Sequence, residues 1–379
     1  MVTAVTAATA GTAVTAKTHS LGNPMQRALE RIGIQSEDFA EMAGPLGVTP
    51  KETIYAQGTL KLHHYLPLTD EVYRVPVLIV TSVVNQPYIL DLVPGQSMVE
   101  FLLRQGFDVY LIEWGRPRRE HKDLVLEDYV LKLLPECVAR VQKDSGEQQL
   151  SIIGYCLGGL LSVLYAALYS ARHAPHQAAL HTAQSKRALK NLVCIAAPVN
   201  ADGMVSLKAW LGPKFDEEAI IDQFGNVPAE WVQNSLRALR PFGKVSGAMN
   251  LLNNMDKPDT VRSNLRMGKW ETDNIPFPGA AFRQLINDFI RGNKLIKGTW
   301  DIGGQRIDLS QIRVPFLHLL AQEDHIIPYA SSQQLLHMIG SKDKQEAIIK
   351  GGHVGLVAGR GAELRMWPTL NEWLAARST

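Results

Sequence analysis

The chain has 379 residues, with 39 lysines and arginines against 37 acidic residues and a formal net charge of +2. This balance excludes the broad basic surface of a nucleic-acid-binding protein, because the densest basic run, residues 116–119, is short and flanked by acidic side chains. Three cysteines do not support a disulfide framework and indicate a reducing compartment. No apolar run reaches the roughly 18–20 residues that span a bilayer.

The N-terminal segment is rich in Thr, Ala and Val, but it lacks the basic region and compact apolar core of a signal peptide. We therefore expect a disordered tail over residues 1–20 and a cytoplasmic protein. Residues 24–42 carry helical spacing, and residues 54–66 indicate a strand or a hairpin.

Short apolar runs then alternate with helical patterns along most of the chain. The runs are typical of strands buried on both faces, and they occur at residues 75–80, 106–112, 150–153, 192–197, 314–320 and 345–349. Helical spacing occurs at residues 98–104, 126–143, 160–168 and 367–376. This alternation predicts βαβ units and a mostly parallel sheet.

The sequence GYCLGG at residues 154–159 joins one of these strands directly to a helix. This order is typical of the nucleophile elbow of the α/β-hydrolase fold, with Cys156 in the place of the usual serine. Glycines permit the tight turn and the close approach of strand and helix. Taken alone, the pattern fits a buried structural cysteine equally well, and its position between strand and helix favours the nucleophile.

Residues 200–298 break the alternation, with helical segments and no clear run of buried strands. In an α/β-hydrolase a lid is often inserted at this point. We therefore expect a hydrolase core at residues 21–199 and 299–379 around a mainly helical lid or cap domain at residues 200–298. Its aromatic side chains either line an apolar access route or form the core of the lid, and the second is favoured for most of them because aromatics dominate ordinary burial. They are Trp210, Phe215, Phe224, Trp231, Phe242, Trp270, Phe277, Phe282 and Phe289.

A nucleophile of this kind needs a histidine base and an acid that orients it, each after a strand. Asp324 follows the run at residues 314–320, and His353 lies in a glycine-rich loop after residues 345–349. Asp324 alone could merely cap a turn, but the order of nucleophile, acid and histidine predicts the triad Cys156, Asp324 and His353. His325 is either a structural residue of the same loop or an auxiliary catalytic group.

The triad predicts attack of a Cys156 thiolate on an acyl carbonyl, with His353 taking the thiol proton. Backbone N–H groups must then stabilise the oxyanion, and the fold supplies Leu157 and a donor after the strand at residues 75–80, for which we favour Val83. Cysteine suits acyl transfer from a thioester, because the acyl-enzyme is itself a thioester and the exchange is nearly balanced in energy.

The remaining cysteines and histidines give no second site. Cys137 and Cys194 lie in apolar patterns and are expected in the core. His173, His176 and His181 have no nearby carboxylate or cysteine, so we expect no metal site. The sequence contains neither a phosphate-binding loop nor a dinucleotide fingerprint, and we expect no cofactor.

Several long motifs resemble those of the polyhydroxyalkanoate synthases, which polymerise (R)-3-hydroxyacyl-CoA into a storage polyester. The matching motifs extend from about residue 50 to the C-terminus. They are VNQPYILDL at residues 84–92, VYLIEWG at 109–115, GYCLGG at 154–159, WETDN at 270–274, EDHIIP at 323–328 and GGHVG at 351–355.

The resemblance implies that Cys156 carries the growing chain as a thioester and that His353 activates it. It implies that Asp324 helps to activate the hydroxyl of the incoming unit, and that coenzyme A is part of the substrate and a product. It also implies a homodimer, a lid over the cysteine, and polymer collected in cytoplasmic granules, with the enzyme at their surface. A short-chain substrate such as 3-hydroxybutyryl-CoA is expected.

The sequence combines features of two subclasses of these synthases, so it does not decide between them. The short N-terminal region resembles the class III synthases, which depend on a second subunit, whereas residues 270–274 resemble the long, single-subunit class I enzymes. Two alternatives to a synthase stay open. One is a cysteine-dependent thioesterase or polyester depolymerase of the same fold, and the other is a non-catalytic granule-associated protein.

Overall fold

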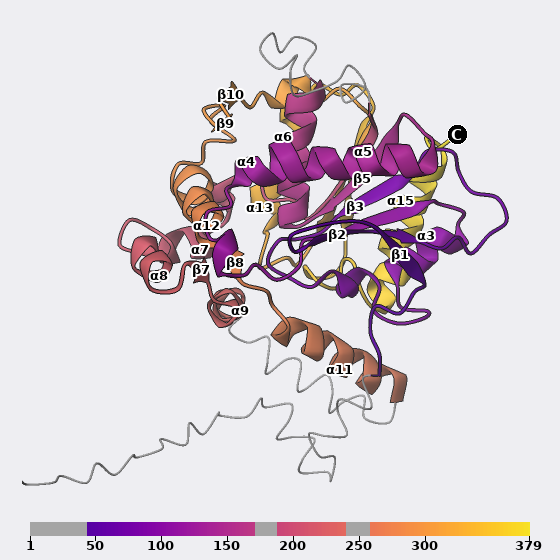
Figure 1. The fold of residues 1–379 in the computed structure, drawn as a ribbon, viewed down its shortest axis with the longest axis horizontal. Helices are drawn as coiled ribbons and strands as arrows, with labels where there is room; N and C mark the ends of the chain where they lie inside the picture. Colours follow the sequence, from indigo (N-terminus) through magenta and orange to yellow (C-terminus); the bar gives the residue numbers. More distant parts are fainter. Residues whose placement is uncertain (1–43, 171–187, 240–257) are drawn as a thin grey trace, which may run out of the picture.

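The computed structural model describes residues 44–170, 188–239 and 258–379. The predicted tail, the helical pattern at residues 24–42, Phe242 and the three histidines at 173, 176 and 181 lie outside these ranges. An eight-stranded sheet forms the centre of the molecule, in the order β1-β2-β4-β3-β5-β6-β11-β12 (Figure 1). Its strands are β1 (Lys51–Gln57), β2 (Leu60–Tyr65), β3 (Val77–Val80), β4 (Val109–Glu113), β5 (Leu150–Tyr155), β6 (Leu189–Ile195), β11 (Phe316–Ala321) and β12 (Lys344–Ile349).

The sheet is mostly parallel, as the sequence predicts. The β1–β2 and β2–β4 pairs are antiparallel and the other pairs of this sheet are parallel, and β1 and β2 form a hairpin, one of the two alternatives that the sequence offered. β3 and β5 are buried along their whole length, which explains their continuous apolar sequences. β4 begins three residues later than predicted, because Gly106 has a φ of 85° and turns the chain. β6 ends before Ala196, whose φ of 48° breaks the extended conformation.

Helices cover both faces of the sheet. The chain moves from β3 to β4 through α3, and then back past β3 to β5 through α5. Because parallel crossovers are right-handed, these opposite directions place α3 and α5 on opposite faces. α6 packs over β3, β5 and β6, and α15 packs against α3. Their bounds are α3 (Met98–Arg104), α4 (Leu126–Asp128), the π-helical η3 (Tyr129–Leu133), α5 (Leu134–Ser145), α6 (Leu157–Ser170) and α15 (Trp367–Ala375).

Over the described ranges, no helix is both long and apolar enough to cross a membrane.

Smaller elements complete the C-terminal half. The elements are a β9–β10 hairpin (Asp301–Ile302 and Gln305–Arg306) before β11, the short helices α13 (Tyr329–Ser332) and α14 (Leu335–Met338) before β12, and the π-helical η8 (Ala362–Met366) that leads into α15.

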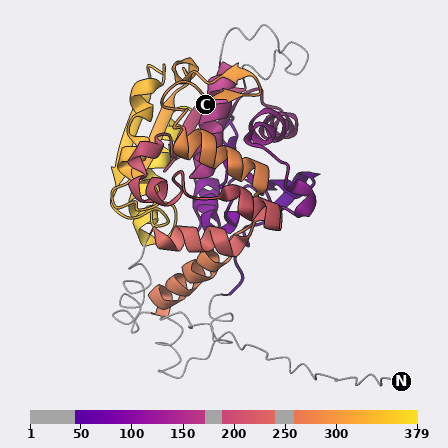
Figure 2. The same cartoon turned by 90° about the vertical axis from the view of Figure 1, so that its left-hand side faces the viewer.

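Between β6 and β11 the chain leaves the sheet for the segment predicted as a lid. Its helices gather at one end of the molecule, where Figure 2 shows them across the front. The side-chain amide of Asn293 donates to Asn200 Oδ1 over 2.8 Å, so the two ends of the segment meet. The elements are α7 (Val205–Trp210), α8 (Glu217–Phe224), β7 (Asn226–Val227), α9 (Ala229–Ala238), α11 (Pro258–Thr272), β8 (Phe277–Pro278), α12 (Gly279–Gln284) and the π-helical η6 (Leu285–Arg291). The role of this segment as a lid stays a prediction.

The aromatic side chains of the segment divide by burial. Trp270, Phe277 and Phe289 are buried and Phe215 and Phe282 are half-buried, as expected of a core. Trp210, Phe224 and Trp231 are exposed by 41%, 43% and 38%. Most of the described aromatics therefore lie in the core, as predicted, and the exposed three are the exceptions.

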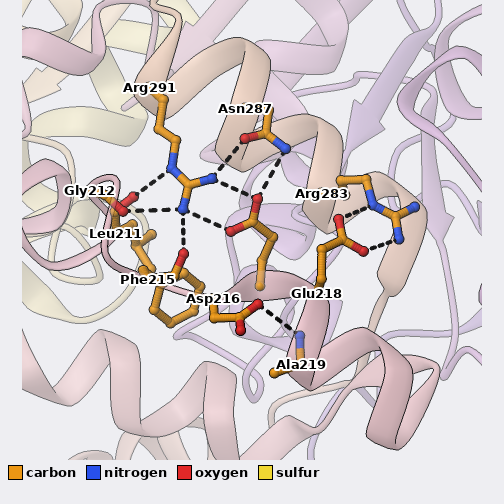
Figure 3. A network of polar contacts seen from close by, with 10 residues as sticks. Leu211, Gly212, Phe215, Asp216, Glu218, Ala219, Arg283, Asn287 and Arg291 are labelled. Atoms are coloured by element: carbon orange, nitrogen blue, oxygen red, sulfur yellow. Dashed lines mark hydrogen bonds and ion pairs between the residues drawn. The ribbon is translucent and has the colours of Figure 1, made fainter.

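Arg291 is the centre of the polar network that holds this segment together (Figure 3). Its guanidinium is paired with the buried carboxylate of Glu217 over 2.6 Å. It also donates to Asn287 Oδ1 and to the backbone carbonyls of Leu211, Gly212 and Phe215, over distances between 2.6 and 3.3 Å. One side chain therefore ties η6 to the loop before α8.

We expect Arg291→Leu to lower the free energy of unfolding by about 3 kcal/mol, because it leaves the Glu217 charge buried without a partner. The matched control is Arg283→Leu, which breaks a half-exposed pair between α12 and Glu218 of the same helix α8 and should cost less than about 1 kcal/mol. Urea unfolding of the two variants measures the difference. Equal losses would contradict the central place of Arg291.

Candidate active site

Cys156 lies at the junction of β5 and α6, in the left-handed region of backbone conformation with a φ of 56°. A residue other than glycine rarely adopts this conformation, and it is typical of the strained turn of a nucleophile elbow. The Cys156 amide donates to the carbonyl of Ile195 on the neighbouring β6 over 2.9 Å. Cys156 directly precedes the 14-residue helix α6.

The glycines of the elbow are required by its neighbours. A Cβ atom at Gly158 would lie 2.2 Å from the carbonyl oxygen of Val80 and 2.5 Å from that of Thr81. One at Gly159 would lie 2.7 Å from the Cβ atom of Ala197. The elbow is therefore wedged between the carboxyl ends of β3 and β6, and this contact sets the height of Cys156 above the sheet.

Asp324 and His353 meet beside the elbow. Asp324 follows β11 and His353 follows β12, and these strands pair in parallel, so both loops leave the same edge of the sheet. His353 Nδ1 donates to Asp324 Oδ2 over 2.7 Å. Asp324 Oδ1 accepts the amides of Ile326 and Ile327 over 2.9 and 2.8 Å. The carboxylate is fixed by three donors and can orient the imidazole.

Cys156 completes the group, because it lies close enough to His353 to influence the charge of the imidazole. Burial alone lowers the pKa of this imidazole, but the charges of Asp324 and Cys156 and the hydrogen bond to Asp324 raise the pKa of His353 to about 10. All three residues are buried. The structure thus brings the three residues of the predicted triad to one place at the carboxyl ends of β5, β11 and β12.

Tyr155 is a contact of His353 that sequence reasoning missed. Its ring stacks on the imidazole with 5.3 Å between centroids, and its hydroxyl donates to the His353 carbonyl over 3.4 Å. Its place beside Cys156 in the elbow is the only signal that the sequence offers. The stacking fixes the plane of the imidazole from a second side.

The two predicted oxyanion donors lie at the expected places. Leu157 is the first residue of α6, and Val83 is buried in the loop after β3. Within the described ranges, the amides of both residues have no hydrogen-bond acceptor. Both N–H groups are therefore available, and their role as an oxyanion hole stays a prediction.

The other candidates differ in their surroundings. His325 is exposed and has no hydrogen bond to another described residue, so its auxiliary role stays a prediction. Cys137 and Cys194 are fully buried, as predicted for core cysteines, and burial raises the pKa of the Cys137 thiol to about 12. In the basic run, Arg116 pairs with Asp273 and Arg118 pairs with Glu120.

Comparison with known proteins identifies the family. Residues 76–359 match the model of the alpha/beta hydrolase fold, and residues 2–102 match that of the poly-beta-hydroxybutyrate polymerase (PhaC) N-terminus. The chain is 33% identical to the poly(3-hydroxyalkanoate) polymerase subunit PhaC of Allochromatium vinosum, over 87% of this chain and 90% of that protein. The chain belongs to the poly(3-hydroxyalkanoate) polymerase family. It is an enzyme of polyester synthesis, of the acyltransferase type.

Other polymerase subunits support this assignment. Identity to the PhaC subunit of Thiocystis violacea is 32%, over 95% of each chain. Identity to the PhaC subunit of Haloferax mediterranei is 34%, over 91% of this chain and 67% of that protein. The chain resembles these relatives along most of its own length.

Solved structures confirm the α/β-hydrolase fold. A candidate lipase from Sulfolobus solfataricus superposes with a TM-score of 0.56 at 16% identity, covering 86% of this chain and 93% of that one. A soluble variant of monoglyceride lipase from Saccharomyces cerevisiae gives a TM-score of 0.50 at 15% identity, covering 88% and 97%. At such identities the likeness is one of fold alone.

The raised pKa of His353 predicts a pH-dependent contribution to stability. Because the folded imidazole binds its proton more tightly than the unfolded one, the contribution is complete below pH 6.5 and is lost as the pH rises through about 10. Asp324→Asn keeps the acceptor for the two amides but removes the charge. We expect its destabilisation relative to the parent to be large at pH 6 and to shrink toward pH 10.

Urea unfolding of the parent and of Asp324→Asn across this pH range measures the effect. His325→Gln, a change at the exposed neighbouring histidine, should reproduce the parent profile. A constant difference between parent and Asp324→Asn would show that the imidazolium–carboxylate pair does not provide the stability.

Proposed function

We propose that this enzyme polymerises (R)-3-hydroxyacyl-CoA into polyhydroxyalkanoate through a thioester on Cys156, with release of coenzyme A. The observation that supports this most directly is the buried group of Cys156, His353 and Asp324 in a chain of the polymerase family. The expected substrate is short-chain, such as 3-hydroxybutyryl-CoA. No cofactor is expected.

Acylation begins with attack of the Cys156 thiolate on the thioester carbonyl of the substrate. The amides of Leu157 and Val83 stabilise the tetrahedral oxyanion. As the intermediate collapses, the bond to the sulfur of coenzyme A breaks, and His353 gives its proton to that leaving thiolate. The products are an acyl thioester on Cys156 and free coenzyme A, with His353 left neutral.

Chain growth uses the hydroxyl group of the next unit. Neutral His353 takes the hydroxyl proton while the oxygen attacks the Cys156 thioester, and the sulfur leaves as a thiolate. The new bond is an ester. We assign the proton to His353 and not to Asp324, because the Asp324 side chain is only 1% exposed and already binds His353 and two amides. Asp324 then acts by orienting and stabilising the imidazolium.

The same proposal includes a lid, an assembly with a further subunit and a location for the enzyme. The 200–298 segment acts as a lid, since it contacts the loop after β3. The enzyme works as a homodimer or with a second synthase subunit, as the short class III synthases that it resembles do. It is cytoplasmic, and it sits on the surface of the granules into which its insoluble product collects.

We expect Cys156→Ala to lower the rate of coenzyme A release from 3-hydroxybutyryl-CoA by on the order of 10³-fold or more, as removal of a nucleophile does. Cys194→Ala is the matched control, since that cysteine is buried in the core. A thiol reagent assay follows coenzyme A, and chromatography of the product follows polymer. Release that persists in Cys156→Ala would exclude Cys156 as the nucleophile.

The same assay separates the two alternatives. Free 3-hydroxybutyrate without polymer would identify a thioesterase or depolymerase. No turnover by the purified chain, alone or with its native partners, would leave a non-catalytic granule protein. Ester-linked chains that grow with time support the synthase.

A further inference from the structure

The loop after β3, residues 81–86, receives three hydrogen bonds from a distant part of the chain. The Trp270 indole donates to the Gln86 carbonyl over 2.7 Å. The Ile275 amide donates to the Val84 carbonyl over 3.1 Å, and the Asn274 side chain donates to the same oxygen over 3.4 Å. We call residues 270–275 the clasp. It contains the whole WETDN motif, for which the triad provides no explanation.

Asp273 anchors the clasp from outside. One carboxylate oxygen accepts the Tyr88 hydroxyl over 3.0 Å, and the other is paired with Arg116. Arg116 also donates to the Asn274 carbonyl over 3.0 Å. Tyr88 lies directly after the loop and Arg116 directly after the turn that ends β4, so the clasp is tied to the sheet on two sides.

The opposite end of the loop is held by the sheet itself. The Trp114 indole donates to the Thr81 carbonyl over 2.9 Å, and the Thr81 hydroxyl donates to the Ile112 carbonyl over 2.7 Å. Between Thr81 and Gln86 the chain has no helix or strand of its own. The position of Val83 therefore depends on Trp114 at one end and on the clasp at the other.

We propose that Trp270, Asp273 and Arg116 are positioning residues that set the oxyanion hole by holding the loop that contains Val83. This inference rests on the proposed function only for the assignment of Val83 as a donor. An oxyanion donor is effective only within a narrow range of distance, and a small misplacement lowers the rate strongly. Through the clasp, the 200–298 segment contributes to catalysis without supplying a reacting group.

The test compares two reactions of Cys156. Acylation by p-nitrophenyl butyrate forms a tetrahedral oxyanion, whereas alkylation by iodoacetamide is a direct displacement that forms none. We expect Trp270→Phe and Arg116→Gln to lower the acylation rate by about tenfold while the alkylation rate stays within about twofold. Trp231→Phe and Arg118→Gln are the matched controls on exposed positions, and both rates should match the parent.

Equal loss of both rates, or no loss of acylation, would overturn the proposal. Arg116 and Asp273 are partly exposed, so Arg116→Gln and Asp273→Asn test it even if Trp270→Phe fails to fold. For coenzyme A release, the expected change is a tenfold fall in kcat with KM within about twofold. A parent that releases no coenzyme A refutes the synthase, while selective loss of acylation in the variants still supports the clasp.

Discussion

The left-handed backbone of Cys156 is the constraint on which the rest of the site depends. It exists because the chain must leave a buried strand and enter a helix within one residue, with Gly158 pressed against the end of β3 and Gly159 against Ala197, just beyond β6. Both glycines therefore belong to the packing of the sheet as much as to the turn. The strain is maintained by buried strands on either side, so the stability of the core is what presents the nucleophile.

The acid and the base are placed by strand pairing. β11 and β12 run in parallel with Ala321 opposite Ile349, and the two loops that follow bring Asp324 and His353 within hydrogen-bonding distance. The amides of residues 326 and 327 then fix the carboxylate, and Tyr155 fixes the imidazole. Each member of the triad is thus held by contacts that do not involve the other two, which preorganises the group before substrate arrives.

The sequence predicts those parts that local chemistry determines. Continuous apolar runs indicate buried strands, and a cysteine between glycines at a strand–helix junction indicates the elbow. Strand ends were predicted less well, because the left-handed residues Gly106 and Ala196 end regular structure in ways that apolar patterns do not reveal. The contact between Trp270 and Gln86 could not be predicted at all, since it joins residues 184 positions apart. The exposed tryptophans at 210 and 231 show that aromatic content alone does not determine burial.

The meeting of Asn200 and Asn293 has a consequence for how this architecture can diverge. Because the 200–298 segment leaves and rejoins the core at one pair of side chains, its length and sequence can change while β6 and β11 remain neighbours. The clasp restricts that freedom, and so do the hydrogen bonds of Gln284 with Leu126 and Glu127 and that of the Ala280 amide to the Lys122 carbonyl. We therefore expect variation in length and sequence to accumulate in those parts of the segment that lie between its attachments to the core.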